Sequence, residues 1–475
     1  MSQIQHQTRG RVFANVARGC LGNLVEWFDW FVYASFSLYF AASFFPSGDP
    51  TAQLLSTSVI FAVGFFMRPV GGWLLGHFAD RRGRRAALTL SISLMSLGSL
   101  VIGLTPGYQT IGLGAPVLLV VARLVQGLSV GGEFGSSAAY LAEVATPGRR
   151  GFYSSFQYVS IVLGQLLALA TLIVLQHSIS TEALANWGWR IPFFIGAVLG
   201  LVVMYLRYSM EESEFYKQDM AATTKARNQG TEVRTGLYSL LTEYPRQLVA
   251  VFCLAIGGTV AFYAYTTYLQ KYMVNTAGLS KDDATLVSFI ALFLFMCLQP
   301  VMGAISDRVG RRKVMLFFSI GGLVGTVPIF TLLAHASSAL IAFALMMTAL
   351  VVLSGYTALA AVIKAELFPT KVRALGVGIP HALVAAAFGG TTETVALTFK
   401  SAGHEAAFFW YVTGCVGLTL VAVVLVRETM VRSELDTPVR GVARQPVAAL
   451  PNGHARTAWM NHSSVLDARF IAADD

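Results

Sequence analysis

Long apolar runs alternate with short polar connections along most of this chain. The runs lack the 3.6-residue and two-residue alternation that one wet face imposes, so whole segments are apolar all round. A helix needs about 20 such residues to cross the hydrocarbon core of a bilayer. The pattern predicts twelve membrane-spanning helices, near residues 20–42, 54–77, 86–105, 114–142, 152–176, 190–208, 248–270, 285–305, 314–334, 338–366, 374–398 and 405–426.

The composition supports lipid as the solvent of these helices. Of the 475 residues, 55% are hydrophobic and only 12% are charged, and the mean hydropathy is +0.61. Soluble domains carry about twice that fraction of charge. The first run follows a short polar leader and lacks a small-residue cleavage site, so we expect a retained helix. We infer an all-α integral membrane protein.

The net charge of +9 could indicate a nucleic-acid partner, so the positions of the basic residues matter. Seven of them lie within the predicted helices or at or beyond the outer boundary, namely Arg68, Arg123, Lys364, Arg190, Lys271, Lys281 and Lys400. The others fall on the side of residue 1. This asymmetry follows the positive-inside rule, which places both termini in the cytoplasm. The charge therefore reports topology, and we expect no nucleic-acid partner.

The chain divides into two membrane parts. A polar, glycine-interrupted interval separates the sixth predicted helix from the seventh. We expect a six-helix bundle over 1–208, a cytoplasmic linker over 209–247 and a second six-helix bundle over 248–427. The polar remainder, 428–475, contains Pro and Gly without an apolar heptad and is expected to be a disordered cytoplasmic tail.

Two motifs recur in both parts. "GHFADRRGRR" begins at Gly76, and "GAISDRVGRR" begins at Gly303. "AEVATPGRRG" is echoed by "AELFPTKVRALG" at nearly the same offset, so that Glu143 corresponds to Glu366 and Arg150 to Arg373. The parts are thus interpreted as structural repeats, the usual construction of secondary transporters.

The arginine-rich motifs are predicted to control conformation. Asp80 and Asp307 can cap neighbouring helix N-termini or pair with arginines, favouring one arrangement of the halves. The glycines permit tight turns, and the arginines hold each loop on the cytoplasmic side. The gating candidates are Asp80, Arg81, Gly83, Arg84, Asp307, Arg308, Gly310 and Arg311.

Acidic residues in the predicted helices are candidates for proton coupling, because ionisable groups are costly in the hydrocarbon region. Glu26 and Asp29 are three residues apart and share a helix face. Two carboxylates held close together in a low dielectric cannot both ionise easily. Glu133 lies in "GLSVGGEFG", where Gly127, Gly131 and Gly135 allow another helix to approach closely. For each carboxylate, an internal ion pair with an arginine is the alternative.

Arginines are the candidates for binding an anionic substrate, because guanidinium holds a carboxylate through two parallel hydrogen bonds. Arg68 lies about 18 Å along the helix from Asp80, near the membrane midplane. Arg123 lies within the fourth predicted helix. Tyr33, four residues beyond Asp29, is a further candidate for substrate binding. Arg190 is expected either to attract anions at the outer mouth or to anchor the protein at the membrane interface.

Three further features are weaker candidates. Lys364 is expected to snorkel to the inner boundary, and His381 could relay protons or simply pack. Tyr263, Tyr265, Thr266 and Tyr268 could line a polar path. The four cysteines and eight histidines show no metal-binding or nucleophile–base spacing, so we expect neither a metal site nor an enzyme.

The motif GxxxDRxGRR, present in both halves, resembles the signature of the major facilitator superfamily. "RLVQG" at Arg123–Gly127 resembles a motif of its proton-coupled members. "GNLVEWFDWFVY", "QGLSVGGEFG" and "WGWRIPF" resemble the metabolite:proton symporters, which carry citrate, alpha-ketoglutarate, shikimate, and proline or betaine. "YTTYLQKYMVNTAG" and "KAELFPTKVRALGVG" most resemble members that carry alpha-ketoglutarate. The similarity covers about residues 15 to 427.

The resemblance implies the major facilitator fold in the bacterial cytoplasmic (inner) membrane. It also implies a functional monomer that uses the proton as coupling ion and needs no cofactor. The expected activity is proton-coupled import of a small dicarboxylate, 2-oxoglutarate (alpha-ketoglutarate) first. Another dicarboxylate, citrate, shikimate, or proline or betaine is the alternative substrate. A transporter-like receptor is a further alternative.

Overall fold

The computed structural model describes residues 9–46, 49–82, 84–131, 133–146, 148–208, 236–369, 372–426 and 428–430. Helices make up the regular structure within these ranges. The first half contains α1 (Arg9–Phe44), α2 (Pro50–Arg82), α3 (Arg84–Leu104), α4 (Tyr108–Ile111), α5 (Gly114–Val130), α6 (Glu133–Val144), α7 (Arg150–Ser154), α8 (Phe156–Ser178), α9 (Thr181–Asn186), the 3₁₀ turn η1 (Gly188–Arg190) and α10 (Ile191–Tyr208).

The second half begins with a short helix within the predicted linker. Its elements are α12 (Gly236–Glu243), α13 (Pro245–Tyr263), the π-helical η2 (Ala264–Tyr268), α14 (Leu269–Asn275), α15 (Lys281–Val309), α16 (Arg311–Ala334), α17 (Ala339–Thr357), α18 (Val362–Ala365), α19 (Arg373–Val384), the π-helical η3 (Ala385–Gly389), α20 (Thr392–Ser401) and α21 (Glu405–Leu425). The rest of the predicted linker, 209–235, and the tail from 431 onward lie outside the described residues.

Ten helices in the described ranges are long and apolar enough to cross a membrane. α1 and α3 cover the other two predicted ranges. The apolar part of α3, Thr89–Leu104, is shorter than the other spans, and α1 carries Glu26 and Asp29 among its apolar residues. Large apolar side chains such as Trp73, Leu340 and Leu425 are exposed on the helix surfaces, as expected where lipid is the solvent.

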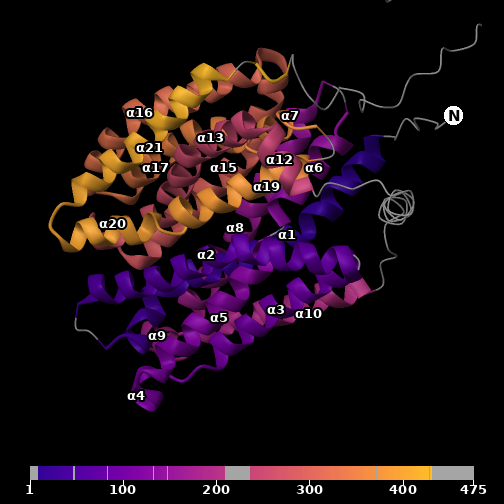
Figure 1. Cartoon of the computed structure of the whole chain (residues 1–475). Coiled ribbons are helices and arrows are strands. Elements are labelled where there is room, and N and C mark those ends of the chain that lie inside the picture. The colour runs from indigo at the N-terminus through magenta and orange to yellow at the C-terminus, as the bar shows by residue number, and fades with distance from the viewer. Residues whose placement is uncertain are drawn as a thin grey trace, which may run out of the picture. The chain divides into compact units, whose positions relative to one another are not determined.

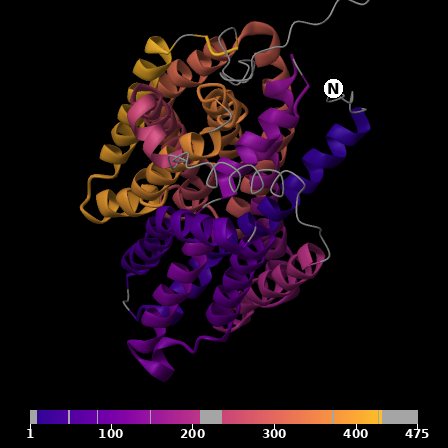
Figure 2. The same ribbon diagram turned by 45° about the vertical axis from the view of Figure 1, so that its right-hand side comes forward.

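Most helices of each half pack with one another, whereas α6 and α7 of the first half lie beside helices of the second (Figure 1). α1 packs on α8, α2 on α5 and α3 on α10 in the first half, and α13 and α16 pack on α21 in the second. The halves meet where α8 and α7 contact α15, where α2 contacts α20, and where α6 contacts α19. Figure 2 shows the same two groups of helices from another side.

Glycines bring helices into close contact, as their spacing predicts. A Cβ atom added to Gly127 would lie 2.0 Å from the Gly64 carbonyl oxygen of α2, and one on Gly131 would lie 1.9 Å from the Arg68 carbonyl oxygen. Gly135 instead faces the other half, 2.5 Å from the Ala374 oxygen by the same measure. This one stripe of small residues therefore serves packing within the first half and contact between the halves.

Candidate functional site

Arg68 and Arg123 both stack against the indole of Trp30. The Cζ atom of Arg68 lies 4.3 Å from the centroid of the Trp30 ring, and that of Arg123 lies 4.0 Å from it. α1 supplies the tryptophan, α2 supplies Arg68 and α5 supplies Arg123. All three side chains are buried. Cation–π contacts hold the two guanidinium groups in place without consuming their hydrogen-bond donors.

Both guanidinium groups retain buried donors. Nε and Nη2 of Arg68 and of Arg123 are buried and make no hydrogen bond to the part of the chain that the structure describes. Arg68 interacts electrostatically with Glu26 and with Tyr263 of the second half. Because unsatisfied buried donors are costly, groups of this kind indicate a ligand that supplies the missing acceptors.

Asp29 lies in a different polar network. Gln126 Nε2 donates to Asp29 Oδ2 at 2.6 Å, and the Ser99 hydroxyl donates to Oδ1. Arg123 Nη1 donates to Gln126 Oε1 at 3.0 Å. The carboxylate of α1 is therefore connected to Arg123 of α5 through an amide. Ser99 and Gln126 were not among the predicted site residues, although "RLVQG" contains Gln126 three residues after Arg123.

Glu26 and Asp29 have separate surroundings despite their spacing. Glu26 faces a cavity with Arg68, whereas Asp29 points toward α3 and α5. Tyr33 lies beside Asp29's network: its ring is 4.3 Å from Arg123 Cζ, and its hydroxyl donates to the Thr57 carbonyl at 3.0 Å. The side chain of Glu133, the third predicted carboxylate, lies outside the described residues.

The cavity that contains Glu26 and Arg68 lies between the halves. It is lined by Asn23, Glu26, Trp27, Arg68, Val130, Gly131 and Phe134 of the first half and by Gly378, His381, Ala382 and Ala385 of the second. Its volume of about 20 Å³ is enough for roughly one water molecule. A larger ligand can therefore enter only if the halves separate.

Helix irregularities surround the cavity. Ala385, which lines the cavity, begins the π-helical η3. Tyr263, the neighbour of Arg68, directly precedes the π-helical η2. Interrupted helices and π-bulges are frequent at the binding sites of membrane transporters and at functional sites generally. The apolar pattern predicted continuous helices here and did not reveal these interruptions.

The predicted snorkelling of Lys364 is wrong. Its side chain is fully buried, 0% exposed, and its Nζ lies 3.3 Å from the Tyr356 hydroxyl and 3.3 Å from His381 Nδ1. α17 ends at Thr357, and the short α18 directs Lys364 into the bundle. Lys271, predicted at the outer boundary, is also buried and pairs with Glu393 at 2.5 Å. Both lysines therefore contact partners within the protein.

Arg190 does not lie with these residues. Its Nη2 donates to the Thr105 carbonyl at 2.9 Å and its Nη1 to the Asn186 carbonyl at 3.2 Å, while its Cζ lies 4.3 Å from the Trp189 ring. These contacts join the loop before α10 to the end of α3. Whether Arg190 attracts anions or anchors the interface stays a prediction.

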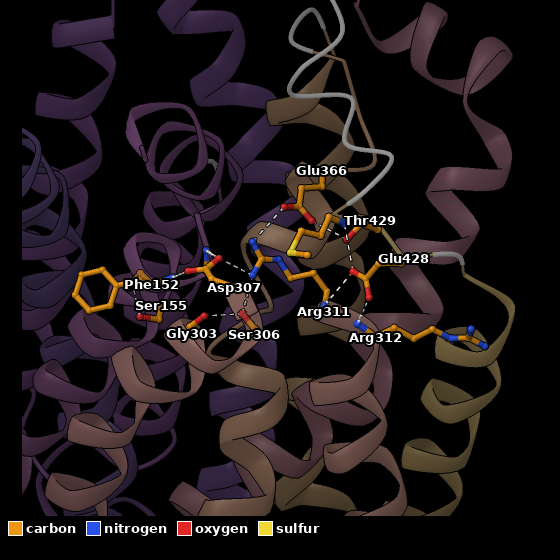
Figure 3. A network of polar contacts seen from close by, with 12 residues as sticks. Phe152, Ser155, Gly303, Ser306, Asp307, Arg311, Arg312, Glu366, Glu428 and Thr429 are labelled. Atoms are coloured by element: carbon orange, nitrogen blue, oxygen red, sulfur yellow. Dashed lines mark hydrogen bonds and ion pairs between the residues drawn. The ribbon is translucent and has the colours of Figure 1, made fainter. Parts of the chain in front are cut away.

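The second arginine-rich motif connects the halves (Figure 3). Asp307 accepts hydrogen bonds from the backbone N–H groups of Gly151 at 2.8 Å and Phe152 at 2.9 Å. Arg311 Nη1 donates to the same carboxylate at 2.8 Å. Asp307 of α15 therefore caps the start of α7, where a negative charge is favourable.

The other gating candidates differ in how fully they are described. Gly310 has φ +99°, a conformation that favours glycine, and it forms the turn between α15 and α16. Arg308 is exposed. In the first motif, Gly83 and the side chains of Asp80, Arg81 and Arg84 lie outside the described residues.

Charged residues of the second repeated motif interact across the halves. Arg373 Nη1 lies 2.6 Å from Glu143 Oε1. Its counterpart Arg150 interacts electrostatically with Glu366, which also lies 3.5 Å from Arg311 Nη2. The arginine of this motif in each half thus interacts with the corresponding glutamate of the other half. This is the pattern that a two-fold arrangement of the repeats requires.

Two stretches of the chain, residues 16–234 and 217–436, match the sugar (and other) transporter family. Together they cover the two halves and their connection. The chain belongs to this family. The relatives below are membrane transporters by name, not enzymes.

Three relatives of this transporter share long regions with it. It is 51% identical to the alpha-ketoglutarate permease of Escherichia coli (strain K12), over 86% of this chain and 91% of that protein. It is 35% identical to the citrate-proton symporter of Salmonella typhi, over 88% and 95%. It is 32% identical to the proline/betaine transporter of E. coli (strain K12), over 88% and 84%.

The transporter also shares its fold with solved structures. The proton:xylose symporter XylE of the major facilitator superfamily, bound to 6-bromo-6-deoxy-D-glucose, superimposes with a TM-score of 0.69 at 20% identity, covering 89% of this chain and 98% of that one. An inward open XylE from E. coli gives 0.61 at 19% identity, over 89% and 98%. The predicted major facilitator fold is confirmed. No cluster of metal-ligating side chains occurs within the described ranges of the transporter.

Proposed function

We propose that this chain is a proton-coupled symporter that imports a small dicarboxylate, with 2-oxoglutarate as the first candidate. It works as a monomer in the bacterial cytoplasmic membrane, with twelve spans and both termini in the cytoplasm. The two halves alternate access to a site between them, as in other transporters built from repeats.

The observation that carries this proposal is the position of Arg68. Its guanidinium lies in the wall of a cavity between the halves and retains two buried donors without partners among the described residues. A carboxylate would satisfy both donors through a bidentate pair. The chain is 51% identical to an alpha-ketoglutarate permease, which supports 2-oxoglutarate as the molecule that carries this carboxylate.

Citrate is the second candidate substrate. The chain is 35% identical to a citrate-proton symporter, and a tricarboxylate can also use several buried cations. A zwitterion such as proline or betaine fits less well, because it has one carboxylate and would leave more cationic groups unsatisfied.

Proton coupling is assigned to Asp29. This carboxylate is buried and connected through Gln126 to Arg123, which shares the Trp30 ring with Arg68. Protonation would remove a negative charge from a low-dielectric network and change how strongly Arg123 is held. Glu26 and Glu133 are the alternative carriers.

Transport by the purified full-length chain tests the proposal. We expect proteoliposomes to accumulate labelled 2-oxoglutarate when the outside is more acidic than the inside, and to show counterflow without a gradient. Unlabelled citrate and proline, added in excess, report whether either competes. Absence of gradient-driven uptake of any carboxylate would contradict symport, and preferential uptake of citrate would replace the substrate.

Asp307 is proposed to stabilise one conformation by capping α7. Asp307→Asn removes the negative charge of the group that accepts hydrogen bonds from Gly151 and Phe152. Hydrogen bonds to a charged group contribute about 1.5–3 kcal/mol each to stability. We expect the maximal transport rate to fall roughly tenfold, with substrate affinity changed less than about twofold.

Initial rates at several substrate concentrations separate the two effects. Asp283→Asn, at an exposed aspartate near the start of α15, is the matched control and should transport normally. A change in affinity with an unaltered maximal rate would show that Asp307 does not control the conformational step.

A further inference from the structure

Lys364 is a buried cation with no acidic partner among the described residues. Its polar contacts are the Tyr356 hydroxyl and His381 Nδ1, each at 3.3 Å. Its Nζ also lies 5.3 Å from the Phe134 ring and 5.6 Å from the Tyr356 ring. A buried ammonium is costly without a counter-ion. By contrast, Lys271 in the same half has Glu393 as its partner.

His381 connects this lysine to the cavity that contains Arg68. When Lys364 is protonated it can only donate, so His381 Nδ1 then accepts and the imidazole hydrogen lies on Nε2. The ring stacks on Phe134 of the first half, with centroids 3.6 Å apart. His381 and Arg68 line the same cavity, and His381 is within electrostatic reach of both Arg68 and Lys364.

The backbone around Lys364 and His381 is interrupted on both helices. The span that contains α17 is broken between Thr357 and Val362, just before Lys364. α19 changes to a π-helix at Ala385, four residues after His381. Such breaks occur in transporters where a helix lines the substrate path. Two helices of the second half are therefore irregular beside the same pair of side chains.

We propose that Lys364 and His381 form a carboxylate-binding subsite in the second half, opposite Arg68. A dicarboxylate places one carboxylate at Arg68 and the other at Lys364 and His381. Each half then holds one end of the substrate, so only a molecule with two carboxylates draws both halves together. This inference rests on the proposed dicarboxylate transport and adds the residues that select for the second charge.

Two ligands of equal carbon number separate this role from a structural one. 2-Oxoglutarate has two carboxylates, and 2-oxopentanoate has a methyl group in place of the distal one. The affinity of the purified full-length transporter for each is measured by titration calorimetry. For Lys364→Met we expect affinity for 2-oxoglutarate to fall about 30-fold or more, while affinity for 2-oxopentanoate changes less than about threefold.

Controls address folding and position. Lys364→Met should keep or raise the apo Tm, because it removes an unpaired buried charge. Lys400→Met, at a partly exposed lysine that contacts Asn275 and Thr276, should leave both affinities unchanged. His381→Phe keeps a ring against Phe134 and should lower affinity for 2-oxoglutarate alone.

The outcomes are distinct. Equal losses for both ligands with a lowered Tm would show a structural lysine and overturn the subsite. Unchanged affinity of Lys364→Met for 2-oxoglutarate would overturn it while leaving the proposed function intact. A wild-type protein that does not bind 2-oxoglutarate would overturn both proposals.

Discussion

Arg68→Gln is expected to abolish high-affinity binding of the dicarboxylate. Glutamine cannot provide the charge or the paired donors of guanidinium, and truncating one partner of a buried charge pair costs about 2–5 kcal/mol. Affinity for 2-oxoglutarate should therefore fall at least about 30-fold. Binding to purified wild-type and variant protein measures this directly.

The structure allows this effect to be separated from a general loss of charge. Arg246→Gln removes a cation from an exposed position at the start of α13 and should bind substrate normally. Arg123 contacts Trp30 but does not line the cavity, so Arg123→Gln should impair coupling more than binding. If Arg68→Gln keeps wild-type affinity, Arg68 does not contact the substrate.

Asp29→Asn is expected to uncouple transport from the proton gradient. Asparagine has nearly the same shape and can stay hydrogen-bonded to Ser99 and Gln126, but its amide does not titrate near neutral pH. Accumulation driven by an acidic exterior should fall to the level without a gradient. Counterflow, which needs substrate binding and conformational exchange but no net proton movement, should continue.

Glu26→Gln is the companion variant for this experiment. Glu26 faces Arg68 and the cavity, so its neutralisation should alter substrate affinity more than coupling. If Glu26→Gln uncouples transport while Asp29→Asn does not, the coupling carboxylate is Glu26. Loss of both accumulation and counterflow in Asp29→Asn would instead indicate a structural role for Asp29.

The two sites suggest one route between proton and substrate. Asp29 reaches Arg123 through Gln126, and Arg123 and Arg68 lie against the same Trp30 ring. A change in charge at Asp29 can thus alter the packing of Trp30 and the position of Arg68. Because this route stays within the first half, we propose that the second contact needed to close on the substrate comes from Lys364 and His381 of the other half.

The approximate positions of the helices could be predicted because they depend on a local property. A segment of about 20 apolar residues is stable in lipid whatever its neighbours are. The turn between α17 and α18 and the π-helical segments η2 and η3 were not predictable in this way. Neighbouring helices and polar side chains compensate the interrupted backbone, and those neighbours are distant in the sequence.

The candidate site shows the same division. Asp29, Arg68 and Arg123 could be singled out because charges in apolar runs are rare and costly. Ser99 and Gln126 could not, since uncharged polar residues are common in membrane helices. Lys364 was assigned to the surface from its distance along the chain, but the turn before α18 directs it inward.

By itself, the sequence determined a membrane protein of two repeated halves and the charged residues that its apolar segments must accommodate. Only the tertiary structure decided that Asp29 is connected to Arg123 through Gln126, that Glu26 and Arg68 line one cavity, and that His381 lines this cavity and contacts Lys364. The physical reason is that solvent preference is a property of each segment. A buried side chain's partner depends on how helices rotate and pack against others far away in the chain.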